Sequence, residues 1–266
     1  MSRGDSVRKP ERRAQVDPPR EPAFINPVRL PQEETVPPRV LVAGPRPELT
    51  YLSARLPGEG KSRRLWLSQL TRARWQGREL LLAGPVLGGP QAALLLEKLI
   101  VLGARAVMMV GWCGSLTPAL PAGSLLIPTR AFPGDGTSPH YLPSGSLPEA
   151  HPGLVSLLTE RIPALADPLG IPWQMGPVWS TDALYRETPS LVQHCQRQGA
   201  LALEMELAAL LAVAACRGVA AGAVLVVTDE LFGEEWRDAT RTPEVRRARE
   251  QAALLALESL AAWEEG

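Results

Sequence analysis

The stretch from Gly199 to Leu231 reads GALALEMELAALLAVAACRGVAAGAVLVVTDEL. Two carboxylates, Glu204 and Glu206, stand in an otherwise apolar segment that we expect to form a buried helix. A buried carboxylate is costly unless hydrogen-bond donors surround it. Because each helical residue turns the chain by about 100°, the two side chains would point roughly 200° apart. We therefore predict that one carboxylate bonds within the protein while the other faces a cavity.

After Gly218 the same stretch continues as an apolar run, which predicts a strand over residues 223–227. Continuous apolar strands are typical of parallel sheets that are covered on both faces. The strand would deliver Asp229 to its carboxyl end, the edge at which open α/β sheets bind ligands. Acidic side chains at such a crevice indicate chemistry.

Composition narrows the class of protein. The 266 residues are enough for one large α/β core. The 28 basic and 28 acidic residues balance, which favours neither nucleic acid nor a membrane surface as a partner. The three cysteines and three histidines show no metal-ligand spacing, and no apolar run reaches transmembrane length. We therefore expect a cytoplasmic protein without a metal or another cofactor.

Two regions differ in composition. Residues 1–38 are rich in proline, arginine and glutamate, which predicts a disordered or loosely packed extension, above all over residues 1–20. From residue 39 onward, apolar strands alternate with small-residue turns and helical stretches. We expect strands over 39–43, 79–83, 106–110, 124–128 and 174–180, and helices over 91–102, 151–164 and 243–263. This pattern predicts a single α/β domain, residues 39–266, with a central mixed, mostly parallel β-sheet flanked by helices.

Five segments then stand in an informative order. They are GWCG at 111–114, DGTSPHY at 135–141, STDALY at 180–185, EME at 204–206 and VTD at 227–229. In this order the chain resembles the nucleoside phosphorylase family, which includes purine nucleoside phosphorylase, uridine phosphorylase and the methylthioadenosine-type nucleosidases. The resemblance covers residues 39–266. It implies a nucleoside substrate and a homo-oligomer, either a dimer or a trimer of dimers, whose subunits complete each other's sites.

The resemblance also implies residue roles. Cleavage of an N-glycosidic bond passes through an oxocarbenium-like ribose, so the sugar must be held and the departing base assisted. Glu206 would accept hydrogen bonds from the ribose hydroxyls, Met205 would pack on the sugar, and Asp229 would act as the acid toward the base. Arg186 and Glu187 are polar and could read a base edge. The base-binding set implied in this way is Leu184, Tyr185, Arg186 and Asp229.

The sequence departs from the family at the phosphate site. Glu48 stands where the family places an arginine, Met109 precedes the central glycine turn, and Trp112 takes a serine or threonine position. A thioether and an indole carry no charge that could neutralise a phosphate dianion. The site for phosphate, as a co-substrate, or for water is assigned to Gly44, Arg46, Gly111 and Trp112.

Three functions therefore remain open. The first is a phosphorylase that cleaves a nucleoside, most simply a purine nucleoside, with phosphate. The second is a nucleoside hydrolase, which Met109 and Trp112 favour, with only Glu48 and Glu204 as candidates for activating water. The third is a non-catalytic nucleoside-binding protein, against which the presence of both Glu206 and Asp229 argues.

Overall fold

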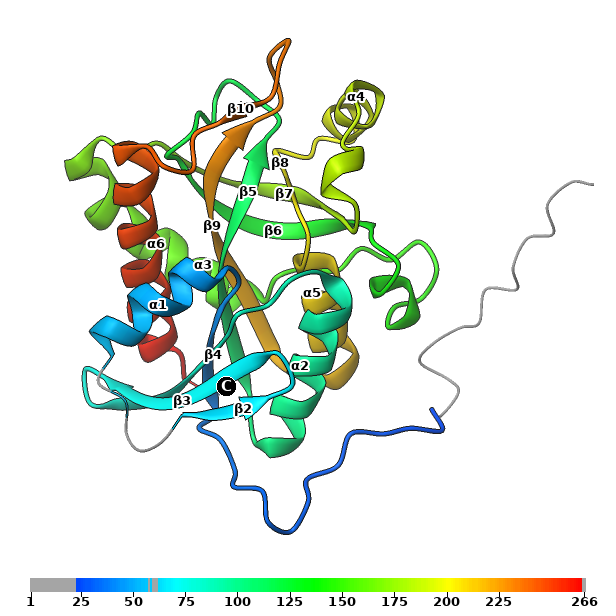
Figure 1. Cartoon of the computed structure of the whole chain (residues 1–266), viewed down its shortest axis with the longest axis vertical. Helices are drawn as coiled ribbons and strands as arrows, with labels where there is room; N and C mark the ends of the chain where they lie inside the picture. The colour runs from blue at the N-terminus through cyan, green and yellow to red at the C-terminus, as the bar shows by residue number, and fades with distance from the viewer. Residues whose placement is uncertain (1–22, 57, 59–61, 265–266) are drawn as a thin grey trace, which may run out of the picture.

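The computed structural model describes residues 23–56, 58 and 62–264, which form one α/β domain around a ten-stranded sheet (Figure 1). The predicted fold class is confirmed. The extension predicted over residues 1–20 lies outside the described residues. Within the described part of the chain, no helix combines the length and the apolar character that a membrane span requires.

Ten strands make up the sheet. They are β1 (Arg39–Ala43), β2 (Arg63–Leu65), β3 (Ser68–Trp75), β4 (Arg78–Gly84), β5 (Ala106–Ser115), β6 (Leu125–Gly134), β7 (Trp173–Thr181), β8 (Ala202–Glu204), β9 (Ala220–Glu230) and β10 (Arg237–Asp238). The α-helices are α1 (Arg46–Arg55), α2 (Gly89–Leu102), α3 (Pro152–Ala166), α4 (Pro189–Arg197), α5 (Leu207–Arg217) and α6 (Pro243–Ala262). Short 3-10 turns η1 (Ser138–His140), η2 (Asp167–Leu169) and η3 (Leu184–Arg186) complete the described elements.

The sheet is mixed, and its middle closes on itself. The strand order is β10-β9-β6-β7-β8-β5-β1-β4-β3-β2, and β9 also pairs with β5, so β5, β9, β6, β7 and β8 form a ring. β1, β5 and β9 run parallel to one another. Their carboxyl ends consequently meet at one edge of the sheet, while the antiparallel strands β2 and β3 extend it on the far side of β4.

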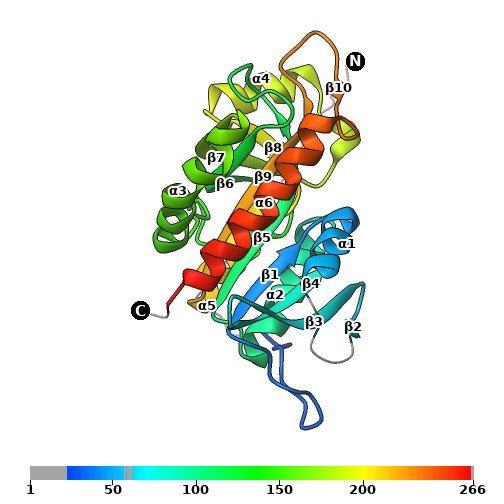
Figure 2. The same cartoon turned by 90° about the vertical axis from the view of Figure 1, so that its left-hand side faces the viewer.

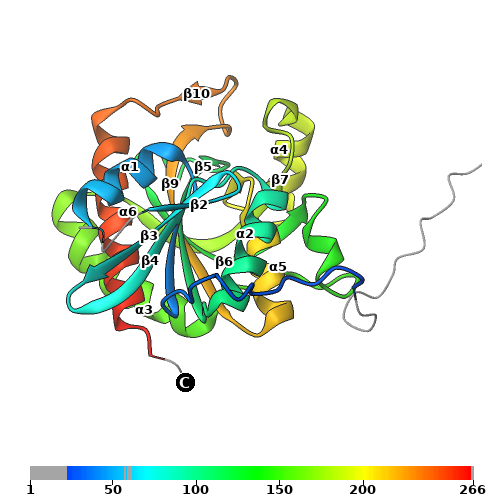
Figure 3. The same cartoon turned by 60° about the horizontal axis from the view of Figure 1, so that its bottom comes forward.

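Helices cover both faces of the sheet, as the apolar strands require. Leucines and alanines of α2 and α5 pack on one face (Figure 3). On the other face, α6 runs obliquely across the sheet and α1 and α3 lie beside it (Figure 2). Burial on both sides explains why β1, β5 and β9 are almost entirely apolar up to their carboxyl ends.

The segment before β1 is attached to the domain by a few contacts. The backbone N–H of Val36 donates to the Leu102 carbonyl at 2.8 Å, and the Val36 side chain is buried. The Lys98 ammonium donates to the Glu33 carboxylate and to the Val28 carbonyl, each at 2.6 Å. Residues 28–36 are therefore held against α2 without forming a helix or strand.

Glu204 and Glu206 do not lie on a helix, and that prediction is wrong. Ala202–Glu204 forms β8, which pairs with β7 and β5, and α5 begins only at Leu207. The Glu204 Oε2 accepts the N–H groups of Glu206 and Leu207, each at 2.7 Å. These N–H groups lie at the start of α5, where the helix itself offers no acceptor. Sheet pairing thus overrides the helical composition of this segment.

The segment Gly111–Gly114 is a strand rather than the predicted turn. It continues β5 as far as Ser115, paired with β9, and the pairing shifts register between Cys113 and Gly114. β9 is likewise longer than the predicted strand and includes Asp229. Both strands are longer than predicted because the residues beyond the predicted ends still pair with the neighbouring strand.

A buried polar cluster joins α1, β5 and α6. Glu48 is fully buried, and its Oε1 accepts hydrogen bonds from Trp112 Nε1 and from Arg249 Nε, each at 2.5 Å. The Arg249 guanidinium lies 5.2 Å from the centroid of the Trp112 ring. Glu48 thus uses its charge inside the protein, at the position where the resemblance led us to expect an arginine.

We predict that Arg249→Ala lowers the free energy of unfolding by about 3 kcal/mol, because it leaves the buried Glu48 carboxylate unpaired. Chemical denaturation measures this change. Arg247→Ala, at an exposed position of the same helix, should change stability by less than about 0.5 kcal/mol. The double variant Glu48→Gln/Arg249→Ala should recover part of the loss. Equal stability of Arg249→Ala and wild type would contradict this account of the cluster.

Candidate functional site

A cavity of about 280 Å³ opens where the carboxyl ends of β1, β5 and β9 meet. Residues from seven segments of the chain line it, so six of the predicted site residues lie together although they are far apart in sequence. Those predicted residues that line it are Gly44, Trp112, Leu184, Met205, Glu206 and Asp229.

Four other predicted residues do not line this cavity. Tyr185 is 96% exposed, and Arg186 in the same turn η3 is also exposed. Arg46 is exposed in the first turn of α1, and Gly111 is buried within β5. In this part of the chain, Leu184 of η3 and Glu187, the residue that follows η3, line the cavity.

Glu204 and Glu206 have different surroundings. Besides the two N–H groups at the start of α5, Glu204 bonds the Ser180 hydroxyl, which in turn accepts the N–H of Ala208 at 2.8 Å. Burial, followed by the neighbouring Glu206 charge, raises the pKa of the Glu204 carboxyl. Glu204 is thus held on both oxygens by the protein and organises the junction of β7, β8 and α5.

Glu206 reaches from the start of α5 to the start of α2. Its Oε1 accepts the N–H of Gly88 at 2.6 Å, and Gly88 is the N-cap residue of α2 with φ of 81°. A side chain at position 88 would be strained at this φ, so glycine suits the contact. Burial raises the pKa of Glu206, while the N–H of Gly88 and the positive end of α2 favour its charged form. The result is a carboxylate fixed in direction on a cavity wall.

Asp229 lies across β5 from this pair. Its Oδ1 accepts the Thr228 hydroxyl and its Oδ2 accepts Trp236 Nε1, each at 2.9 Å. A Cβ on Gly114 would come within 2.9 Å of Asp229 Oδ2, so glycine at this position makes room for the carboxyl. Burial raises the pKa of Asp229 against the opposing effect of these two hydrogen bonds. A carboxyl that retains its proton more readily is suited to acid catalysis.

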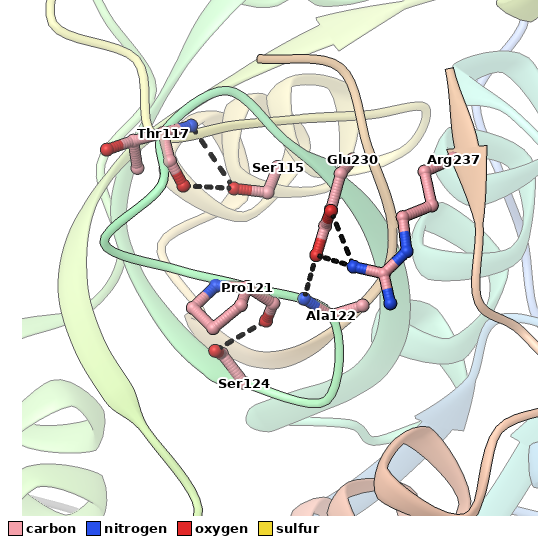
Figure 4. Close-up of polar contacts among 7 residues, drawn as sticks. All are labelled: Ser115, Thr117, Pro121, Ala122, Ser124, Glu230 and Arg237. Atoms are coloured by element: carbon pink, nitrogen blue, oxygen red, sulfur yellow. Dashed lines mark hydrogen bonds and ion pairs between the residues drawn. The ribbon is translucent and has the colours of Figure 1, made fainter. Parts of the chain in front are cut away.

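The next residue, Glu230, belongs to a different network. Its Oε1 accepts the N–H of Ala122 at 2.8 Å, and Arg237 donates to both of its oxygens at 3.0 and 3.1 Å (Figure 4). Bonds from Ser115 and Ser124 fold the same 115–124 loop. Because side chains alternate along a strand, Asp229 and Glu230 at the end of β9 point to opposite faces of the sheet. Glu230 anchors a loop, whereas Asp229 lines the cavity.

Two further polar residues of the cavity lie outside the predicted base-binding set. Glu187, which the sequence offered with Arg186 as a residue that could read a base edge, lines the cavity, and burial together with the charge of Asp229 raises its pKa to about 7. It lies two residues after the end of the STDALY segment. Trp236 also lines the cavity and bonds Asp229, although its side chain is 65% exposed. A tryptophan in a polar loop gives no sequence signal for such a contact.

The charged residue types that line the cavity are all acidic. Glu187, Glu204, Glu206 and Asp229 line it, and the described residues that form its wall include no lysine, arginine or histidine. Trp112 is part of the wall, with its N–H directed to Glu48. Within the described chain, the cavity therefore offers an anion no cationic partner.

This fold and site define a class of protein. An α/β sheet that brings Glu206 and Asp229 to one cavity at its edge is consistent with the arrangement that the family resemblance implied. Residues 40–261 match the family model described as the phosphorylase superfamily. The chain belongs to this superfamily.

Similar proteins include enzymes for different nucleosides. A guanosine phosphorylase of Halorubrum lacusprofundi is 28% identical over 179 residues, which are 66% of this chain and 72% of the relative. A uridine phosphorylase of Escherichia coli K12 is 27% identical over 58% of this chain and 64% of its own length. Among solved structures, uridine phosphorylase of Vibrio fischeri ES114 superposes with a TM-score of 0.76 at 22% identity, covering 86% of this chain and 93% of the other. Purine nucleoside phosphorylase of Toxoplasma gondii gives 0.75 at 22% identity, covering 91% and 97%.

We predict that Glu204→Ala lowers the free energy of unfolding by about 2–4 kcal/mol, because the N–H groups of Glu206 and Leu207 lose their acceptor inside the protein. Glu204→Gln should behave differently, since its amide offers an acceptor to these N–H groups and a donor to Ser180. A raised pKa makes the wild-type protein lose stability as the pH rises above the ordinary carboxyl value of 4.5, because the folded state binds the extra proton.

Glu204→Gln should consequently become more stable relative to wild type as the pH increases from about 5 to about 8. Thermal unfolding of both variants across this range measures the effect. A constant difference between Glu204→Gln and wild type would show that Glu204 does not titrate in this window.

Proposed function

We propose that this protein is a nucleoside phosphorylase-type enzyme that cleaves the N-glycosidic bond of a purine nucleoside. The observation that carries the proposal is the presence of Glu206 and Asp229 on one cavity, each held by hydrogen bonds that fix its direction. Phosphate is the proposed acceptor of the ribosyl group, as in the named relatives.

Glu206 is the proposed ribose-binding residue. A carboxylate accepts but does not donate hydrogen bonds, so it suits a pair of vicinal hydroxyls. Charge developing on the sugar in an oxocarbenium-like transition state is stabilised by a nearby carboxylate in a site of low dielectric constant. Met205, on the same cavity wall, would cover the sugar with an apolar surface.

Asp229 is the proposed general acid for the departing base. Burial raises the pKa of Asp229, which favours its protonated form, and proton donation to a ring nitrogen improves a purine as a leaving group. Trp236 donates to the same carboxyl in the structure, so base binding would exchange this hydrogen bond for one to the base. Leu184 offers an apolar surface beside it.

Hydrolysis is the second candidate, because a specific observation favours it. Trp112 occupies the cavity wall, Glu48 and Arg249 neutralise each other behind it, and the described wall carries no cation for phosphate. Phosphorolysis would need Arg46, exposed near Gly44, or a residue of another subunit. Neither acid named for activating water is free, because Glu48 is buried with Arg249 and Glu204 caps α5.

The decisive experiment follows release of free base from adenosine, guanosine, inosine, uridine and methylthioadenosine, with and without phosphate. We expect purine nucleosides to be cleaved, and Glu206→Gln to reduce kcat/KM by at least about 100-fold while the unfolding temperature stays close to wild type. Phosphate-dependent release supports phosphorolysis, and release without phosphate supports hydrolysis. Binding without any product would establish the non-catalytic alternative and overturn the proposal.

Asp229→Asn should reduce cleavage of purine nucleosides by about 10²–10⁴-fold, because the amide cannot deliver a proton to the leaving base. Glu230→Gln is the matched control at the adjacent position, since its amide oxygen can still accept the N–H of Ala122. Steady-state rates of the two variants measure the difference. Equal rates for Asp229→Asn and Glu230→Gln would remove Asp229 from the mechanism.

We also propose a homo-oligomer in the cytoplasm, as a dimer or a trimer of dimers. In support, the cavity opens beside apolar side chains that are exposed in the single chain, namely Leu87, Leu184 and Trp236.

A further inference from the structure

A groove of about 1490 Å³ lies along α2, apart from the cavity that Glu206 and Asp229 line. Its walls are formed by residues 23–30, the β2–β3 turn, α2, the loop 136–143 and the carboxyl end of α5. Figure 3 shows the segment before β1 passing across α2 and α5. Among the described residues, none lines both the groove and the cavity, so the groove is a separate surface of the molecule.

Large apolar side chains that face solvent are concentrated around this groove. Seven of them are at least 43% exposed, and each lines the groove or is the chain neighbour of a residue that does: Phe24, Ile25, Val28, Leu30, Trp66, Leu67 and Leu94. Together they expose on the order of 800 Å², which is comparable to the surface that one partner contributes to a stable dimer. Such an area also exceeds the largest apolar patch of a typical monomer.

The β2–β3 turn exposes its apolar side chains in a strained conformation. Trp66 has φ of 51°, in the left-handed region that favours glycine, where another residue costs about 1–2 kcal/mol. The side chains of Trp66 and Leu67 are nevertheless 53% and 74% exposed. Backbone strain of this kind is concentrated at functional positions. An exposed tryptophan in a strained turn therefore indicates a contact outside the single chain.

The ion pairs at the groove lie within the chain. The Lys98 ammonium donates to the Glu33 carboxylate at 2.6 Å. Arg217 donates to both oxygens of Glu97, at 2.8 and 2.9 Å. An apolar surface whose lysine, arginine and glutamate are already paired resembles the core of a protein interface, where unpaired charges are rare and aromatic residues are common. It suits another protein surface better than an ionic ligand.

We propose that two copies of this chain associate through this groove about a two-fold axis, with Phe24 and Ile25 of each copy packed against Trp66 and Leu94 of the other. An isologous contact requires one patch to be complementary to itself. Each copy carries both an apolar segment, residues 23–30, and an apolar groove, so each supplies what covers the other. The inference gives the proposed homo-oligomer a specific face and does not depend on the proposed activity.

Leu94→Lys tests this face, with Met175→Lys as the matched control. The two side chains are 57% and 54% exposed, but Met175 lies on β7 and does not line the groove. Sedimentation of the full chain is measured over a range of protein concentrations. We expect Leu94→Lys to raise the dissociation constant of the pair by at least about 100-fold, because an unpaired ammonium would be buried in the contact. Met175→Lys should sediment as wild type does.

Cys216 gives a second measurement, because it is exposed on the groove wall whereas Cys113 and Cys195 are buried. Its alkylation should be slower in wild type than in Leu94→Lys at the same protein concentration. Equal alkylation rates, or an oligomer whose dissociation constant is unchanged in Leu94→Lys, overturn the inference and leave the proposed homo-oligomer intact.

Wild type that sediments as a monomer at every concentration overturns both the inference and the proposed homo-oligomer. Leu94 is exposed in the single chain, so the substitution should leave the fold unchanged. Circular dichroism of Leu94→Lys verifies that the variant is folded.

Discussion

The arrangement of the carboxyl edge of the sheet depends on the free-energy cost of burying carboxylates there. Each acid there is tolerated for a separate reason. Glu204 accepts the N–H groups of Glu206 and Leu207 at the start of α5, and Glu206 accepts the N–H of Gly88, the N-cap residue of α2. Asp229 accepts from Thr228 and Trp236. Two of the three solutions use the start of a helix, where donors without partners and the helix dipole favour negative charge. The α2 and α5 helices therefore position the site as well as cover the sheet.

The same constraint explains the division between structural and functional acids. Glu204 and Glu230 have both their charge and their hydrogen-bonding capacity used within the protein. Glu206 and Asp229 also bond the protein and, like Glu204, line the cavity, but Glu206 is bound through Oε1 to Gly88 and Asp229 to Thr228 and Trp236 rather than to the junction of β7, β8 and α5. The acids thus come in pairs along the chain, 204 with 206 and 229 with 230. Glu204 accepts the N–H of Glu206, whereas Glu230 anchors the 115–124 loop through the N–H of Ala122.

The cluster of Glu48, Trp112 and Arg249 lies where the resemblance led us to expect an arginine for an anion. In this chain the position holds a buried acid that is paired with Arg249 of α6. Arg249 lies 201 residues from Glu48 in the sequence, so no local pattern could pair them. The pairing of Glu48 is therefore visible only in the tertiary structure, although the unusual residue itself is visible in the sequence.

The sequence by itself determined the class of fold, the elements with strong apolar patterns and the presence of Glu206 and Asp229 at the cavity, because these depend on local periodicity and on short motifs. It gave the wrong secondary structure for Glu204-Met205-Glu206 and for Gly111–Gly114, because strand pairing with β5, β7 and β9 outweighs local propensity. It could not find the contact of Trp236 with Asp229, nor separate Glu187 from Tyr185 and Arg186. Only the tertiary structure decides which side chains of a turn face the cavity, since that depends on how η3 and α4 pack and not on residue type.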